Sequence, residues 1–119
     1  MKIAVTSTGQ DITSEVDPRF GRAPYILVVD SDSMDIEVID NRENANSLKG
    51  AGIQAASAVS KKGAQVLLTG HCGPNAFKAL KAAGIAVVNG AQGTVSSGVK
   101  AYLEGNLKEA EEPGAEGHW

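Results

Sequence analysis

The sequence predicts one three-layer α/β domain with a five-stranded mixed sheet and three helices. Its 119 residues suit a single domain, since domains commonly span roughly 100 to 150 residues. Apolar residues make up 42% of the chain but aromatic residues only 4%, so Val, Ile, Leu and Ala must fill the core. In the second half, short apolar runs alternate with segments of helical spacing, which is typical of parallel strands joined by right-handed crossovers.

The first half of the chain predicts three strands. Residues 2–6 are mostly apolar and end at Ser7, and an irregular segment with two glycines and two prolines fills positions 7–24. That connection exceeds the usual length of about 4 to 6 residues, and such long loops are often functional. Residues 25–30 and 35–40 flank a polar turn, which predicts an antiparallel hairpin.

The second half predicts alternating helices and strands. The first helix spans 51–62, where Ile53 falls at helical spacing with Ala56 and Val59, and it ends in a cationic turn followed by Gly63. It is followed by a strand over 65–69, a helix over 74–83 and a strand over 85–88. The last helix spans 94–104 and carries Leu103 on its apolar face.

Charge divides the chain into a body and a tail. The net charge is −3, and residues 104–119 hold five glutamates against one lysine, a balance of −4, which leaves +1 for residues 1–103. We therefore expect one domain over 1–105 and a flexible acidic tail over 106–119. The body has no run of lysine and arginine, so we expect no nucleic-acid partner.

Several other classes of protein are disfavoured by the composition. No apolar run approaches the roughly 20 residues of a membrane span, and the amino terminus lacks a signal-peptide pattern, so we expect a cytoplasmic protein without membrane contact. The single cysteine excludes an internal disulfide framework and any multi-cysteine metal site from one chain. The oligomeric state stays open between a monomer and a weak homodimer, in which symmetry would double that cysteine.

Three loops rich in Gly, Ser and Asn should emerge together. They follow the strands that we expect to be parallel, so residues 7–9, 70–75 and 89–94 meet at one edge of the sheet. In the second loop, Gly73, Pro74 and Asn75 form a helix start whose backbone N–H groups can hold an anion. An ordinary helix start is an equally weighted reading. Neither a Walker A motif nor a dinucleotide fingerprint is present.

The same loop carries the candidate metal ligands, Cys72 and His71. A helix amino terminus can lower a thiol pKa and favour the thiolate, a soft metal ligand. Against this, free cysteine is among the most buried residue types, and packing is the more frequent role. One adjacent Cys-His pair does not supply a catalytic constellation, so we expect no enzyme activity.

The long first loop carries a candidate anion-recognition motif over residues 19–22. Arg19 and Arg22 flank Phe20 and Gly21, an arrangement that suits a multiply charged anion. The alternative is a solvated loop with a surface salt bridge. Phe20 is more simply an anchor to the core than a ligand contact.

These motifs, in this order and spacing, resemble the dinitrogenase iron–molybdenum cofactor biosynthesis family, which includes small stand-alone members and a molybdenum–copper protein of sulfate reducers. The resemblance covers roughly residues 1–105. Many relatives have histidine where this chain has Arg19, so no histidine ligand is carried over there, and Cys72 is not a fixed family feature. The resemblance to this family is carried by the segments 2–5, 16–23, 50–52, 69–76 and 84–85.

The resemblance implies a ribonuclease-H-like fold and the binding or transfer of an anionic metal–sulfur cluster, either like the iron–molybdenum cofactor or a molybdenum/copper sulfide. Cluster-assembly proteins would then be partners. Residues Phe20, Gly21, Arg22, Gly70, Gly73 and Pro74 carry over best. Arginines and loop amides can hold such a polyanion without a set of cysteines.

Three functions follow from these patterns together with the resemblance. The leading hypothesis is a non-catalytic carrier or assembly scaffold for the cluster. The second is a protein-interaction or regulatory module that docks on a partner such as a cluster-assembly ATPase. The third, a ribonuclease-like hydrolase, rests on fold analogy alone and would need clustered carboxylates that the sequence does not show.

Overall fold

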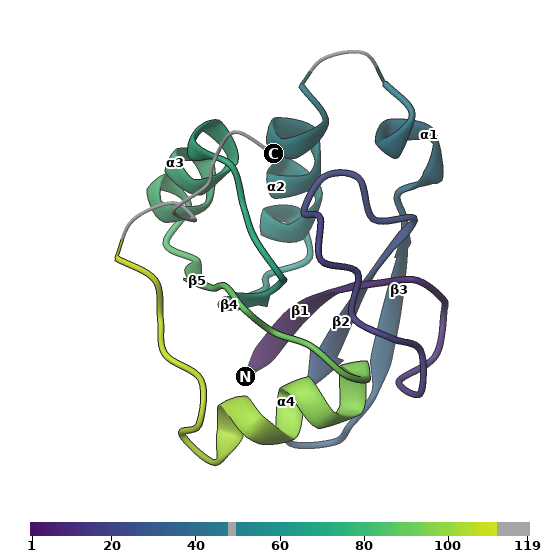
Figure 1. Cartoon of the computed structure of the whole chain (residues 1–119), viewed down its shortest axis with the longest axis vertical. Helices are drawn as coiled ribbons and strands as arrows, with labels where there is room; N and C mark the ends of the chain where they lie inside the picture. Colours follow the sequence, from purple (N-terminus) through teal and green to yellow (C-terminus); the bar gives the residue numbers. More distant parts are fainter. Residues whose placement is uncertain (48–49, 112–119) are drawn as a thin grey trace.

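The computed structural model describes residues 1–47 and 50–111. These residues form five strands and four helices arranged as one α/β domain (Figure 1). In chain order the elements are β1 (Lys2–Ser7), β2 (Tyr25–Asp30), β3 (Ile36–Asp40), α1 (Arg42–Ala45), α2 (Ala51–Lys61), β4 (Val66–Leu68), α3 (Pro74–Ala82), β5 (Ala86–Val88) and α4 (Val95–Leu103).

The five strands form one mixed sheet with the order β3-β2-β1-β4-β5. Strand β1 lies in the centre, antiparallel to β2 and parallel to β4. The hairpin β2–β3 is antiparallel, and β4 and β5 run parallel. The predicted mixed sheet is confirmed. Because β1, β4 and β5 share one direction, the loops that follow them leave the sheet at the same edge.

Two apolar clusters hold the sheet between layers of helix. Helices α2 and α3 cover one face and α4 covers the other (Figure 1). Alternate residues of β1 serve the two clusters: Ala4 faces α2 and α3, whereas Ile3 and Val5 face α4, as the period of two in a strand requires. The expected three-layer arrangement is confirmed.

Two apolar residues that we expected to be buried are exposed. Ile53 is 47% exposed and Leu103 is 50% exposed. In α2 the buried face consists of Ala51, Ala55, Ala56 and Val59, and Ile53 lies outside this stripe. Small alanine side chains let the helix lie close to its neighbours. Leu103 is the last residue of α4 and falls beyond the packed part of that helix.

Helix α1 is the element that the sequence analysis missed. It has four residues and none of them is buried, so it leaves no hydrophobic periodicity to detect. Polar contacts hold it instead. The buried side chain of Asn41 donates from Nδ2 to the carbonyl oxygens of Gly21, at 3.1 Å, and Ala23, at 2.8 Å.

The chain continues past α4 along the outer strand β5. The backbone N–H of Ala110 donates to the carbonyl of Val87 at 2.6 Å, and Glu109 pairs with Lys81 at 2.7 Å. Leu107 packs against the cluster beneath α4. The expected tail over 106–119 thus begins with contacts to the body, its flexibility stays a prediction, and residues 112–119 lie outside the described part. No helix within the described ranges is long and apolar enough to cross a membrane.

Candidate functional site

The three predicted loops meet at the carboxyl edge of the parallel strands. The N–H of Thr8, in the first loop, donates to the carbonyl of Glu15 at 3.0 Å, and the N–H of the adjacent Val16 donates to the carbonyl of Gly93, in the third loop, at 2.8 Å. The N–H of Gly90 donates to the carbonyl of Gly70 at 2.7 Å, which joins the third to the second. The predicted convergence of these loops is confirmed.

Residues 17–23 of the long loop after β1, here called the arginine loop because they include Arg19 and Arg22, pair directly with the loop after β4. The N–H of His71 donates to the carbonyl of Pro18 at 2.9 Å, and the N–H of Phe20 donates to the carbonyl of His71 at 3.2 Å. Arg19 and His71 form a parallel bridge. Gly70 permits this approach, because a Cβ there would lie 2.5 Å from Cα of Pro18, closer than packed atoms tolerate.

Gly21 brings the arginine loop onto the start of α2. Its φ of +91° favours glycine, and a Cβ would lie 2.9 Å from both N and Cα of Gly52. Gly52 in turn lies against α3, because a Cβ there would be 3.0 Å from Cβ of Ala76. Gly52 is the second residue of α2 and Ala76 the third of α3. The starts of both helices therefore lie side by side, next to Gly21.

Neither of these two helix starts is capped by a side chain. Gly50 precedes α2 and Gly73 precedes α3, and neither first turn contains an acidic residue. Pro74 occupies the first helical position of α3 as predicted. In contrast, Thr94 caps α4 by accepting a hydrogen bond from the N–H of Ser97 at 3.1 Å. The positive ends of two helix dipoles thus point to the same edge without a negative side chain to offset them.

Arg19 lies on the outside of this edge and faces a buried carboxylate. Its side chain is 59% exposed, and Asp17 is 3% exposed. The Arg19 N–H donates to Oδ1 of Asp17 at 2.9 Å, while the guanidinium approaches that carboxylate only to 3.4 Å. A salt bridge between Arg19 and Asp17 is thus present, as the alternative interpretation of this loop expected. The pair is loose, however, and the guanidinium keeps donors for an anion.

The guanidinium of Arg22 contacts two backbone carbonyls, and its part in anion recognition stays a prediction. Its Nη1 donates to the carbonyl oxygens of Ala45, at 2.8 Å, and Ser47, at 2.7 Å. The side chain therefore ties the arginine loop to the segment that leads into α2. Carbonyl oxygens carry no net charge, so the positive charge of Arg22 still adds to the field at the helix starts.

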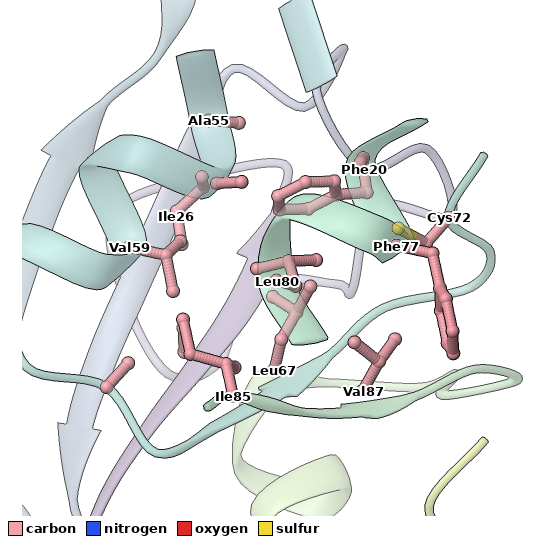
Figure 2. Packing of buried hydrophobic residues seen from close by; sticks show 14 of the residues in the cluster. Phe20, Ile26, Ala55, Val59, Leu67, Cys72, Phe77, Leu80, Ile85 and Val87 are labelled. Carbon is pink, nitrogen blue, oxygen red and sulfur yellow. The ribbon is translucent and has the colours of Figure 1, made fainter. Parts of the chain in front are cut away.

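Phe20 and Cys72 belong to the interior. Figure 2 shows both in the cluster that also contains Phe77 and Leu80, so the reading of Phe20 as an anchor agrees with its burial. Cys72 is 1% exposed, and burial raises the pKa of its thiol to about 12. This burial agrees with the packing role that we gave as the more frequent one, and the alternative of a lowered thiol pKa is wrong because desolvation disfavours the thiolate.

The remaining predicted residues line the rim of the site. His71 is half-buried and pairs through its backbone with the arginine loop, and Asn75 is exposed in the first turn of α3. Within residues 1–47 and 50–111, no group of three His, Cys, Asp or Glu side chains is placed to hold a metal ion. The ligand roles of His71 and Cys72 stay predictions, and the arrangement is one of amides and arginines.

Four residues of the site were missing from our candidates. Gly50 and Gly52 entered the sequence analysis only as part of a family motif, and Asn41 and Asn44 lie between two predicted elements, where we predicted no structure. The cue for the glycines was their spacing at a helix start. The asparagines gave no cue, because their partners are backbone groups distant in sequence.

The family is decided by comparison with known proteins. The family model described as dinitrogenase iron-molybdenum cofactor matches residues 1–105. The chain belongs to this dinitrogenase iron-molybdenum cofactor family. It resembles the apo orange protein of Desulfovibrio gigas, with 46% identity, 95% of each chain covered and a TM-score of 0.92. It also resembles a NifB candidate from Thermotoga, with 37% identity, 91% of each chain covered and a TM-score of 0.79.

The fold is shared more widely than the sequence. A candidate dinitrogenase from Methanocaldococcus jannaschii has a TM-score of 0.70 at 17% identity, covering 95% of this chain and 97% of that one, which supports the fold alone. No curated protein matches the chain. The dinitrogenase iron-molybdenum cofactor family and the orange protein associate the chain with a cofactor of the metal-cluster type.

Proposed function

We propose that this protein is a non-catalytic carrier or assembly scaffold that holds an anionic metal–sulfur cluster where α2 and α3 begin. One observation carries the proposal: two uncapped helix starts lie side by side next to a glycine-lined loop that presents Arg19. Family membership supports a cluster as cargo. The cluster would resemble the iron–molybdenum cofactor or a molybdenum/copper sulfide.

The chemistry of such cargo suits this arrangement. Metal–sulfur clusters of this kind are polyanions, and backbone N–H groups at helix starts favour negative charge. Gly50 and Gly73 place no side chain in front of these amides, and the space where a Cβ would lie is open at both residues. A large anion can therefore approach the backbone closely. Because the amides are fixed before binding, little conformational entropy is lost on association.

The two arginines make separate contributions. Arg19 is the exposed cation, and we assign it direct contact with the cargo. Arg22 is engaged with two carbonyl oxygens, so we assign it the placement of the loop and a longer-range share of the field. Held mainly by such noncovalent contacts, the cargo can be released intact to an acceptor, as a carrier requires.

The test is a titration of metal-free protein with tetrathiomolybdate, alone and with copper, followed by visible absorption and metal analysis after desalting. We expect stoichiometric colour that stays with the protein. Arg19→Gln should weaken binding about five- to tenfold, the loss of one exposed charge-assisted hydrogen bond. Binding should also depend less on salt in this variant, because one screened attraction is gone.

Lys61→Gln is the matched control. It removes the same charge from the exposed last turn of α2, at the opposite end from the proposed site, so affinity should stay within about twofold of the unmodified protein. If folded protein retains no thiomolybdate, or if both variants lose affinity equally, the carrier proposal fails. Docking on an assembly partner then becomes the better account.

A further inference from the structure

The α1 segment is held to the body by polar contacts rather than by packing. None of the helical residues Arg42–Ala45 is buried, yet Asn41, immediately before them, is 4% exposed. Apolar burial therefore does not explain why the segment lies where it does. The hydrogen bonds of Asn41 and Asn44 explain its position.

These contacts form a continuous chain from the arginine loop to α2. Asn41 donates from Nδ2 to the carbonyls of Gly21 and Ala23. Its Oδ1 accepts a hydrogen bond from Nδ2 of Asn44 at 2.9 Å. The same Nδ2 of Asn44 donates to the carbonyl of Ala51, the first residue of α2, at 2.9 Å.

We propose that Asn41 and Asn44 are the positioning residues of the anion site, which fix the arginine loop against the start of α2. The inference rests on the proposed function for its consequence in binding. Arg22 works in the same direction, because its guanidinium bonds the carbonyls of Ala45 and Ser47 from the loop side. Contacts in both directions thus join the loop to the segment before α2.

The positioning matters because the loop has few other contacts on that side. On the β4 side, backbone pairing holds Pro18 and Phe20 to His71. Past Gly21 the internal turn bonds run from the N–H groups of Arg22 and Ala23 to the carbonyl of Arg19, at 3.2 and 3.0 Å. Without the asparagine side-chain contacts, the remaining hydrogen bonds on this side are those of Arg22 and the one from the N–H of Asn41 to the carbonyl of Pro24 at 2.9 Å. We expect the loop to shift more readily from the amides of α2, so that bound cargo loses simultaneous contact with both.

Asn44→Ala tests the inference in the full chain. Asn44 is half-buried, and alanine removes both of its amide contacts without adding bulk. We expect hydrogen exchange at the amides of Arg22 and Ala23 to quicken about five- to tenfold while exchange in β1 and β2 stays unchanged. Tetrathiomolybdate affinity should fall about tenfold.

The salt dependence of the affinity separates the positioning role of Asn44 from the direct charge contact of Arg19. Since Asn44→Ala removes no charge, the slope of affinity against salt should equal that of the unmodified protein, whereas Arg19→Gln lowers this slope. Asn46→Ala is the matched control. Asn46 lies two residues further on and its Nδ2 donates only within the segment, to the carbonyl of Arg42 at 3.0 Å. Loop exchange and affinity should both stay unchanged there.

Each outcome decides the inference. Unchanged loop exchange in Asn44→Ala overturns it, whether or not any anion binds. Faster loop exchange with unaltered tetrathiomolybdate affinity also overturns it, because the loop position then does not matter to the site. If the unmodified protein binds no tetrathiomolybdate, the proposed function fails by itself, and the exchange rates still decide whether these asparagines hold the loop.

Discussion

Gly70 should be the least replaceable residue of the site. In Gly70→Ala the new methyl group would lie 2.5 Å from Cα, 2.7 Å from Cβ and 2.7 Å from the carbonyl oxygen of Pro18. Two of these atoms are backbone, so the arginine loop itself must move. The shift would strain or break the two backbone hydrogen bonds between this loop and His71. Overpacking of about 1 to 3 kcal/mol plus about 1 kcal/mol for weakened pairing gives a loss of about 2 to 4 kcal/mol.

Urea denaturation followed by far-UV circular dichroism measures this loss. Gly73→Ala is the control three residues away: nothing lies within 4 Å of its added methyl group, its φ is −69°, and the cost should stay below about 1 kcal/mol. The slope against urea should be equal in both variants, so that midpoints compare directly. Equal stability of the two variants would refute the close approach of Pro18 to Gly70.

Three further predictions concern the interior and the C-terminal segment. Asn41→Ala should lower the free energy of unfolding by about 1 to 3 kcal/mol, because two loop carbonyls lose their buried donor, as thermal and urea unfolding can show. Since burial raises the pKa of Cys72 from 9.0 to about 12, only the unfolded thiol ionises between these values and stability falls as pH rises through them; iodoacetamide at pH 9 should label native protein far more slowly than urea-unfolded protein. Lys81→Gln removes the 2.7 Å ion pair that holds the C-terminal segment and should speed tryptic cleavage after Lys108 by up to about fivefold, whereas Lys78→Gln on the same helix should not.

Strong patterns in the sequence predicted the sheet and three of the four helices. The continuous apolar runs of β2, β4 and β5 reflect burial directly. The alternation in β3 predicted a strand correctly, although none of its residues is buried. Helix α1 escaped because hydrogen bonds to distant carbonyls hold it, and such bonds leave no periodic signal. Ile53 was misplaced for a related reason: an alanine-rich face buries α2, and the largest apolar residue lies beside that face.

The meeting of the loops at one edge was predicted better than the contacts of their side chains. The loops after parallel strands must meet at one edge, so the proximity of Gly70 and Arg19 followed from topology. The different partners of Arg19 and Arg22 did not, because residue type and spacing cannot show whether a guanidinium faces a carboxylate or two carbonyls. For Cys72, the sequence left both a thiolate with a lowered pKa and a packed thiol open, and only the depth of burial favoured the packed thiol.

The uncapped start of α3 sets stability against binding, and Gly73→Asp separates the two. Space is open around Gly73, and an aspartate there can accept a hydrogen bond from the first-turn amides and offset the helix dipole. The variant should therefore gain about 0.5 to 1 kcal/mol of stability. The same carboxylate would occupy the amides proposed for the cluster and repel its charge, so tetrathiomolybdate affinity should fall by about tenfold or more. A more stable protein that binds equally well would show that the amides of α3 take no part in the site. A more stable protein that binds poorly would show that the missing cap of α3 serves binding at a cost in stability. Helix α4, which the Thr94 side chain caps, does not carry this cost.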